Sequence, residues 1–170
     1  MVLVEARSFP DERGKFLEMY KKSDFARAGI KAEFVQDSIS ISKKNVLRGL
    51  HFQKPPHVQA KLIGVVAGKI LDVAVDMRKS FPNFGKWVAQ ELSDENAKML
   101  YIPEGFAHGF LVLSEEARVC YKMSKEYAPG SDGGVIWNDL KLNISWPVDN
   151  PILSEKDSKL PSFENAFYFE

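Results

Sequence analysis

The stretch KLIGVVAGKILDVAVDM, residues 61–77, decides the fold class of this chain. It is rich in Val, Ile and Leu, which favour extended strands, and Gly68 marks a turn between two of them. Because side chains alternate along a strand, Asp72 and Asp76 share one face of the second strand, while the other face is apolar throughout. The pattern predicts the wall of a barrel or sandwich. It leaves open which face points inward, since a lumen that holds a ligand can be polar.

Short stretches of the same character follow, separated by clusters of Pro, Asn, Asp and Gly that favour turns. They are KWVAQELS (86–93), KMLYIP (98–103), GFLVLS (109–114), RVCYKMS (118–124) and GVIWND (134–139). Many short strands at near-regular spacing predict an all-β jelly roll or sandwich. Two short helices are expected. One covers Ser23–Ala28, with Ser23 as its N-cap and Gly29 as its stop, and the other begins near Ser154.

Length and composition exclude several classes of protein. The 170 residues favour one domain over residues 1–170. Lys and Arg total 23, as do Asp and Glu, and this balance argues against a nucleic-acid or polybasic membrane partner. Cys120 is the only cysteine, which excludes an intrachain disulfide and a cysteine-built zinc site. With no apolar run of the ~20 residues that a span needs, and no signal-like N-terminus, a cytoplasmic protein is expected.

Two of the three histidines lie in strand-and-turn contexts. His51 lies in LRGLHFQ and His108 in IPEGFAHGF, whereas His57 follows two prolines in a loop. The spacing Pro-x-Gly-x-x-His around His108 is similar to the second motif of cupin β-barrels. Metal-binding cupins carry His-x-His and a Glu in their first motif, and here that place has His51-Phe52-Gln53. A tight metal site needs three or four ligands, so no metal is expected, and each histidine could be a base or a packed core group.

A metal-free cavity could instead carry acid–base chemistry. A histidine with a carboxylate such as Asp157 on its far nitrogen is an oriented general base. Lys61 could stabilise an enolate oxygen, and Tyr121 could return a proton from the opposite side. Together these groups could remove and replace a proton alpha to a carbonyl without a cofactor. Taken singly, Lys61 is equally a solvated strand end, Tyr121 a packed aromatic and Asp157 a helix-start residue.

Two arginines suggest a second hypothesis, a site that binds a diphosphate. Arg13 lies in FPDERGKFLE and Arg48 precedes Gly49, near His51. Guanidinium groups match phosphate oxygens in a bidentate manner, so two arginines at a barrel mouth would suit a diphosphate. Ordinary surface arginines in turns are the alternative.

The chain as a whole resembles the dTDP-4-dehydrorhamnose 3,5-epimerase family. The similarity runs through ordered blocks that cover nearly the whole chain: FPDERGKFLEMY (9–20), FVQDSISISKKNVLRGLHFQ (34–53), residues 61–87, LSDENAKMLYIPEGFAHGFLVLS (92–114), YKMSKEYAPGSDG (121–133), IWND (136–139) and WP…LSEKD (146–157). The resemblance implies a cupin jelly-roll homodimer whose N-terminal strands cross to the partner. It also implies cofactor-free inversion at C3 and C5 of a nucleotide-linked 4-keto-6-deoxy sugar, most often a dTDP sugar.

The resemblance also implies roles for individual residues. His51 would be the base, Asp157 its orienting partner, Tyr121 the acid and Lys61 the group that stabilises the enolate. His108 would contact the sugar, and Asp72 would line the pocket and fix the charge of Lys61 or His51. The remaining substrate contacts would be Arg13, Arg48 and Lys156 on the diphosphate, and Glu18, Gln36 and Tyr127 in the nucleotide pocket, with Tyr127 stacked on the base. Ser38 stands where relatives often carry Asn.

Two alternatives stay open at this point. The first is an enzyme that inverts only C3 or only C5, or that isomerises the keto group. The second is a non-catalytic sugar-binding cupin, in which His51, Asp157 and Tyr121 would lie apart. The sequence decides neither the number of inverted carbons nor the nucleotide base.

Overall fold

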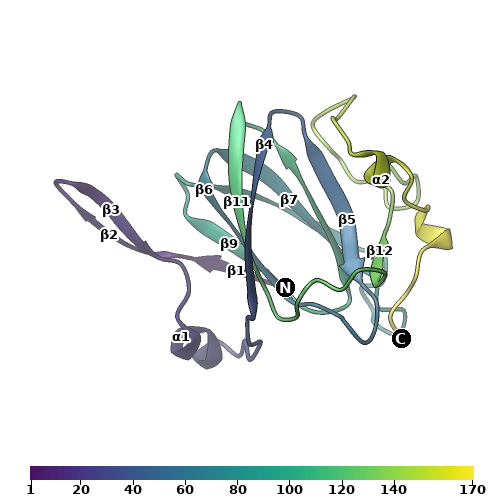
Figure 1. Ribbon diagram of the computed structural model, residues 1–170, viewed down its shortest axis with the longest axis horizontal. Helices are drawn as coiled ribbons and strands as arrows, with labels where there is room; N and C mark the ends of the chain where they lie inside the picture. The colour runs from purple at the N-terminus through teal and green to yellow at the C-terminus, as the bar shows by residue number, and fades with distance from the viewer.

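The computed structural model describes residues 1–170 and is nearly all β, as predicted (Figure 1). Two five-stranded antiparallel sheets form the body. The first has the order β1 (Val2–Glu5), β9 (Lys98–Ile102), β6 (Lys61–Ala67), β11 (Glu116–Met123) and β4 (Gln36–Lys43). The second has the order β12 (Asp132–Gly134), β5 (Leu47–Gln53), β10 (Phe106–Val112), β7 (Lys69–Asp76) and β8 (Trp87–Ser93). This two-sheet arrangement is the expected cupin-like jelly roll.

Residues 61–77 form strands β6 and β7, which lie in different sheets rather than in one hairpin. Gly68, at φ +82°, carries the chain from one sheet to the other, and a Cβ there would lie 2.1 Å from the carbonyl oxygen of Glu116. A side chain therefore cannot fit at this corner. Both faces of β7 are largely buried, so the alternation alone could not reveal the inward face.

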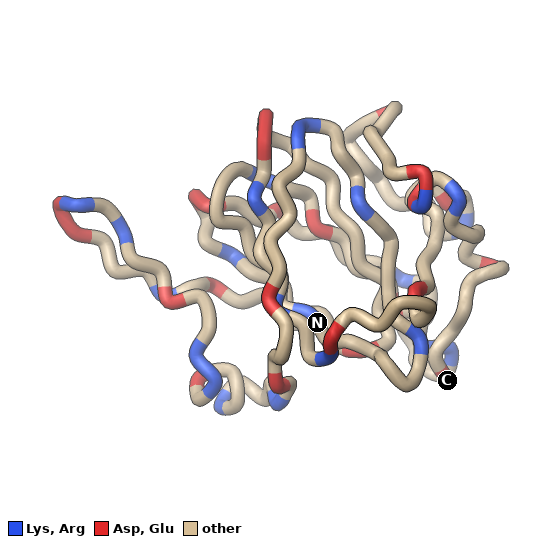
Figure 2. Tube along the Cα trace, viewed as in Figure 1, with Lys and Arg blue, Asp and Glu red and all other residues tan.

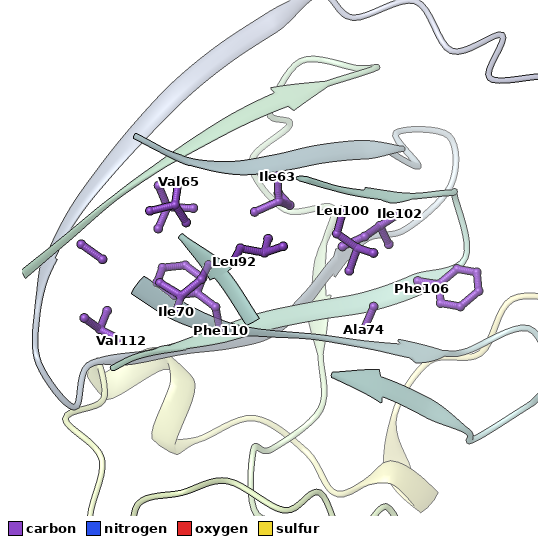
Figure 3. Close-up of a cluster of buried hydrophobic side chains, with 12 residues drawn as sticks. Ile63, Val65, Ile70, Ala74, Leu92, Leu100, Ile102, Phe106, Phe110 and Val112 are labelled. Atoms are coloured by element: carbon purple, nitrogen blue, oxygen red, sulfur yellow. The ribbon is translucent and has the colours of Figure 1, made fainter. Parts of the chain in front are cut away.

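The face of β7 that bears Asp72 points between the sheets. Ile70 and Ala74, which share that face, belong to the central apolar cluster with Ile63, Val65 and Phe110 (Figure 3). This cluster draws on strands β6 to β11 and fills one part of the space between the sheets. The polar side chains on the same inner faces occupy the rest of it, and they form the pocket described below.

The C-terminal segment covers the outer face of the second sheet (Figure 1). Val73, Val75 and Met77 pack there against aromatic side chains that include Phe163 and Phe169. The helix α2 (Glu155–Ser158) and the 3-10 turn η1 (Phe163–Asn165) belong to this segment. The C-terminal chain thus closes the second sheet and brings α2 against β5.

One predicted strand is wrong. GVIWND (134–139) is extended only at its start, because β12 ends at Gly134. Asp139 bends the chain away from the sheet: its carboxylate accepts hydrogen bonds from the N–H groups of Lys141 and Leu142, and also from Phe163. An aspartate that binds backbone two and three residues ahead is a turn signal, and it overrides the apolar pattern here.

The two predicted helices exist, but one begins elsewhere. Helix α1 (Lys22–Arg27) has Lys21 at its N-cap, so the predicted Ser23 cap is wrong; the Ser23 hydroxyl donates to the Asp24 carboxylate instead. Gly29, at φ +84°, ends this helix as expected. In α2, Ser154 is the N-cap and its hydroxyl accepts from the N–H of Asp157. No helix of the protein is long and apolar enough to cross a membrane.

A hairpin of β2 (Arg7–Asp11) and β3 (Gly14–Glu18) projects away from the two sheets (Figure 1). Basic and acidic residues are interspersed along the chain, this hairpin included (Figure 2). The apolar side chain of Phe16 on the hairpin is 69% exposed. The projecting hairpin is therefore an apolar and charged arm that its own chain leaves uncovered.

Candidate active site

A cavity of about 280 Å³ opens between the sheets beside α2. It brings together the four predicted catalytic residues: His51, Lys61, Tyr121 and Asp157. Three predicted substrate-binding residues, Arg48, His108 and Lys156, line the same cavity. Phe110 and Ser154 complete the lining, and neither was predicted.

Strand pairing places the two histidines side by side. His51 on β5 and His108 on β10 are direct cross-strand partners. The two strands come unusually close next to this pair, because Gly49 and Gly109 face each other: a Cβ on Gly49 would lie 2.5 Å from the Gly109 Cα. Glycine is required for such a close backbone approach. The local sequence LRGLHFQ thus fixes where His51 sits.

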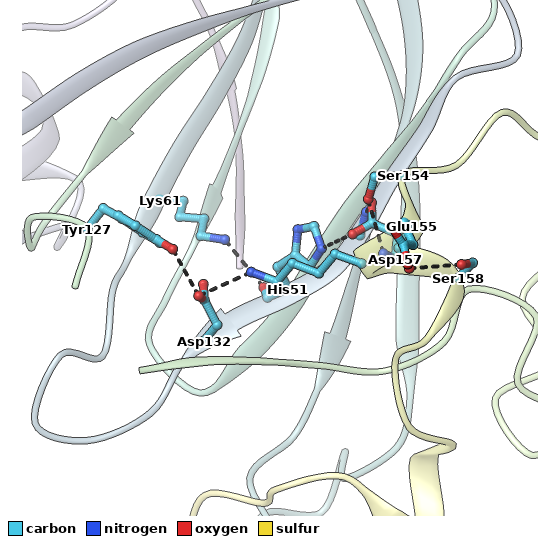
Figure 4. A network of polar contacts seen from close by, with 10 residues as sticks. His51, Lys61, Tyr127, Asp132, Ser154, Glu155, Asp157 and Ser158 are labelled. Atoms are coloured by element: carbon cyan, nitrogen blue, oxygen red, sulfur yellow. Dashed lines mark hydrogen bonds and ion pairs between the residues drawn. The ribbon is translucent and has the colours of Figure 1, made fainter. Parts of the chain in front are cut away.

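His51 is oriented by a buried carboxylate. Its Nε2 lies 2.7 Å from Asp157 Oδ1, and Asp157 Oδ2 accepts a hydrogen bond from the Gly49 N–H at 3.2 Å (Figure 4). Burial raises the pKa of Asp157, but hydrogen bonds from His51, Gly49 and Ser154 and the charge of His51 outweigh it, so the net pKa is lowered. Asp157 therefore stays ionised and holds its hydrogen bond to His51 Nε2.

His108 has a carboxylate partner of its own. Its Nε2 lies 2.7 Å from Asp72 Oδ1, and both side chains are buried. Burial lowers the pKa of His108 despite the nearby Asp72 charge, so the ring is neutral. Asp72 lies behind the histidine and is not part of the cavity lining, contrary to the expectation that it lines the pocket. Its hydrogen bond goes to His108 rather than to Lys61 or His51.

Lys61 and Tyr121 project from the first sheet. Lys61 Nζ donates to the His51 carbonyl oxygen at 3.3 Å, and burial lowers the pKa of Lys61 to about 8, although Asp72 acts in the opposite direction. The Tyr121 hydroxyl lies 3.2 Å from Ser40 Oγ. Burial raises the pKa of Tyr121 to about 12, so the phenol keeps its proton at neutral pH.

The mouth of the cavity carries a polar chain of contacts (Figure 4). The Tyr127 N–H donates to Gln36 Oε1 at 2.7 Å, and the Tyr127 hydroxyl donates to Asp132 at 2.9 Å. Lys156 lies 3.1 Å from the same Asp132 carboxylate. Sequence reasoning missed Asp132, whose only signal was its place after the Pro129-Gly130 turn. Ser38 extends this series of contacts, because its hydroxyl oxygen accepts a hydrogen bond from the Gln36 side-chain amide at 3.4 Å.

Two predicted contacts lie away from this cavity. Arg13 is at the tip of the projecting hairpin, where its exposed guanidinium pairs with Asp11. Glu18 borders a separate groove between β1 and α1. The fold of a single chain therefore brings neither residue to the cavity. Among residues 1–170, no three His, Cys, Asp or Glu side chains are arranged to hold a metal ion.

The sequence model of the family described as dTDP-4-dehydrorhamnose 3,5-epimerase matches residues 1–165. The chain is 51% identical to the dTDP-4-dehydrorhamnose 3,5-epimerase of Shigella flexneri, over 99% of this chain and 94% of that protein. It is similar to the crystal structure of the Bacillus anthracis enzyme with TDP and PPi bound (TM-score 0.93, 48% identity, covering 94% and 92% of the two chains). It is also similar to the Legionella pneumophila enzyme in complex with dTDP-4-keto-L-rhamnose (TM-score 0.92, 42% identity, covering 96% and 87%).

Similarity of this extent, in sequence and in structure, shows that the chain belongs to the dTDP-4-dehydrorhamnose 3,5-epimerase family.

Proposed function

We propose that this enzyme epimerises C3 and C5 of dTDP-4-dehydro-6-deoxy-D-glucose to give dTDP-4-dehydro-L-rhamnose, without a cofactor. The observation that carries the proposal is the 2.7 Å contact between His51 and Asp157 in a cavity shared with Lys61 and Tyr121. A non-catalytic sugar-binding protein has no need for this arrangement. The separation of His51 and Asp157 that such a protein predicts is absent.

Each inversion begins at the base. His51 accepts the proton from the carbon next to the C4 ketone, and the electrons of the broken C–H bond move onto the C4 oxygen. Asp157 stabilises the imidazolium that forms. Lys61, as an ammonium ion, stabilises the enolate oxygen. The same ketone acidifies both neighbouring carbons, so one set of groups can serve C3 and C5 in turn.

Each inversion ends at the opposite wall. His51 comes from β5 in the second sheet and Tyr121 from β11 in the first. A substrate between the two walls therefore has the base on one face and the phenol on the other. Tyr121 donates its proton to the carbon as the enolate collapses. The His51 imidazolium then releases its proton to solvent and the tyrosinate regains one, so both groups are restored for the other carbon. The high pKa of the phenol keeps this proton in place until an enolate is formed.

The cations at the mouth suit the diphosphate. Arg48 and Lys156 line the cavity, and Lys156 is bound to Asp132 beside Tyr127. Their positions support the assignment of the diphosphate to Arg48 and Lys156, with Gln36, Ser38 and Tyr127 toward the nucleotide and His108 against the sugar. The TDP bound to the Bacillus enzyme and the dTDP sugar bound to the Legionella enzyme support thymine as the base.

The remaining contacts require a second chain. The hairpin that bears Arg13 and Glu18 projects away from the two sheets (Figure 1), and neither residue lines the cavity of its own chain. The side chain of Phe16 on the same hairpin is exposed. A homodimer in which each hairpin crosses to the partner would bring Arg13 to a diphosphate and Glu18 to a nucleotide. Residues 1–170 would then act as one domain whose site is completed by its partner. The cytoplasm is the expected place of action.

Proton exchange followed by NMR tests the function. The protein, with no added metal or cofactor, is incubated in D₂O with dTDP-4-keto-6-deoxyglucose, and a downstream reductase traps the rhamno product. Loss of the C3 and C5 proton signals together with trapped product is expected. His51→Ala should abolish exchange at both carbons while circular dichroism shows the fold intact. Exchange at one carbon alone would establish a single-centre epimerase, and binding without exchange would refute the proposed reaction.

A further inference from the structure

The edge strand β4 has its polar and apolar faces exchanged. Ser38, Ser40 and Ser42 alternate along the strand and share the face whose contacts lie between the sheets. Ile39 and Ile41 point the other way and are 64% and 59% exposed. A strand at the side of a sandwich ordinarily turns its apolar side chains inward. The inward hydroxyls of β4 therefore do not serve packing, and their contacts indicate another role.

Two of these hydroxyls hold residues of the cavity, and each holds a different one. Ser40 Oγ lies 3.2 Å from the Tyr121 hydroxyl, and Ser42 Oγ accepts a hydrogen bond from Arg48 Nε at 3.0 Å. Neither serine lines the cavity itself. Each serine can therefore influence a ligand only through the side chain that it holds.

The contact with Ser40 determines what the Tyr121 phenol can do. Tyr121 pairs with Ser38 across the two strands, yet its hydroxyl reaches past that residue to Ser40, the diagonal neighbour. This is the only hydrogen bond that either hydroxyl makes within the protein. With Ser40 as the donor, the phenol proton is free to point into the cavity, and a tyrosinate formed there keeps one charge-assisted hydrogen bond.

We propose that Ser40 is a positioning residue for proton return: its hydroxyl donates to the phenol oxygen of Tyr121, directs the phenol proton into the cavity and stabilises the tyrosinate that remains. The proposal rests on the proposed function for the role of Tyr121 as the acid. Burial raises the pKa of Tyr121 to about 12, and the hydrogen bond with Ser40 acts in the opposite direction, as a donor to the tyrosinate does. Ser40 keeps its own proton throughout, so the Tyr121 O–H bond breaks and the C–H bond of the product forms without a further transfer.

The first test is Ser40→Ala, assayed in D₂O with the nucleotide sugar. Loss of the donor leaves His51 and proton removal intact and weakens only proton return. The ratio of inverted product to deuterium incorporated should fall by about 10-fold, as expected for loss of one hydrogen bond to a charged group. Ser40→Thr keeps the hydroxyl on a residue that favours strands, and it should restore most of the ratio.

The matched control is Ser42→Ala, on the same face of the same strand. It removes the partner of Arg48 Nε, so the affinity for dTDP, measured by isothermal titration calorimetry, should fall while the ratio stays at its wild-type value. Ser40→Ala should show the reverse, with a reduced ratio and wild-type affinity for dTDP. A wild-type ratio in Ser40→Ala would overturn the proposal. An equal fall of the ratio in both variants would also overturn it, because it would show a general distortion of β4.

A second measurement needs no turnover. 3-Fluorotyrosine in place of Tyr121 has a more acidic phenol, so its ¹⁹F signal can be followed through ionisation in folded, ligand-free protein. The midpoint should lie about 1 unit higher in Ser40→Ala than with Ser40 present, and Ser40→Thr should leave it in place. The other titratable or charged groups around this phenol are the same in all three proteins: Arg48 and His51 on β5, Lys61 on β6, Asp72 on β7, His108 on β10, Cys120 on β11, and Lys156 and Asp157 at α2.

The two measurements separate this proposal from the proposed function. A midpoint that is unmoved or lower in Ser40→Ala would overturn the role of Ser40, whether or not the enzyme epimerises its substrate. The expected midpoint shift in a wild-type protein that does not epimerise would uphold the hydrogen bond from Ser40 to the tyrosinate and count against the proposed reaction.

Discussion

His51 and Tyr121 divide proton removal and proton return between two walls of one cavity, and this division can be tested at a single atom. Tyr121→Phe removes the donor and leaves the base with its Asp157 partner. Inversion should fall by about 10²- to 10⁴-fold, while washout of substrate protons into D₂O stays within a few-fold of wild type. The measurement is the ratio of product formed to deuterium incorporated. Inversion at the wild-type rate would show that Tyr121 is not the acid.

Asp157 offers a second test at the scale of one residue. Asp157→Asn keeps the shape but removes the charge that orients and stabilises the imidazolium of His51. The kcat should fall by about 10⁴-fold, by analogy with the same change in serine-protease triads. Glu155→Gln on the exposed face of the same helix is the control and should leave kcat unchanged. A fall of less than about 10-fold in Asp157→Asn would show that His51 works without its carboxylate.

Sequence reasoning identified the reacting side chains but not all of their partners. His51, Lys61, Tyr121 and Asp157 stand in recognisable blocks, and the cavity contains all four. The partner of Asp72 was not predictable, because an alternating strand gives the face of a side chain and not its neighbour on another strand. Asp132 and Ser40 were missed for the same reason: Asp132 contacts Tyr127 and Lys156, and Ser40 contacts Tyr121, only once the chain is folded.

At the scale of the strand, Gly49 lies where the backbones of β5 and β10 are too close for a Cβ between them. In Gly49→Ala the new Cβ would meet backbone atoms of His108 and Gly109, which cannot move aside as a flexible side chain would. The residue also has φ +124°. We expect a loss of about 1–3 kcal/mol in the free energy of unfolding, measured by urea denaturation, and a larger loss of activity because His51 is displaced. Gly130→Ala, in open space at φ +86°, is the control and should cost about 1–2 kcal/mol with activity retained. Equal activity in both variants would contradict this account.

The hairpin of β2 and β3 makes a prediction about assembly. Phe16→Glu places a charge on the exposed apolar face of this arm and should weaken the proposed dimer. Sedimentation velocity should show a shift toward monomer, and the affinity for dTDP should fall with it, since Arg13 and Glu18 would be withdrawn from the partner's site. Leu140→Glu, a nearly fully exposed leucine on a loop, is the control and should change neither. A Phe16→Glu protein that stays dimeric would place the interface elsewhere.

Elements were predictable where local pattern and tertiary contact agree. The strands within residues 61–77 follow from their Val, Ile and Leu content, but their assignment to different sheets depends on the corner at Gly68. GVIWND has the composition of a strand, yet the turn contacts of Asp139 end it early. The predicted Ser23 cap is wrong because the N-cap of α1 is Lys21, two residues earlier, and the Ser23 hydroxyl binds the Asp24 carboxylate.

At the scale of the whole molecule, burial of the charged Lys61 in the site lowers the free energy of unfolding. Burial lowers the pKa of Lys61 to about 8 in the folded protein, below its ordinary value of 10.5. The unfolded chain therefore binds more protons between about pH 8 and 10.5, and wild-type stability should rise through this window. Lys61→Met should raise the free energy of unfolding at pH 7 by about 1–3 kcal/mol while abolishing activity. Urea denaturation at pH 7 and at pH 10.5 measures the free energy of unfolding of both proteins. If the extra stability of Lys61→Met over wild type is not smaller at pH 10.5, the buried charge of Lys61 is not its cause.

The hydrogen bond from His51 to Asp157 joins positions 106 residues apart. Nearly all of the jelly roll precedes α2 in the chain, so both sheets can form on a ribosome before the carboxylate emerges. A nascent chain at that stage would hold the parts of the cavity that the two sheets supply, the base included, but not Ser154, Lys156 or Asp157, and the imidazole would be free to rotate. Competence for proton transfer is therefore conferred late in translation, after the architecture that surrounds it.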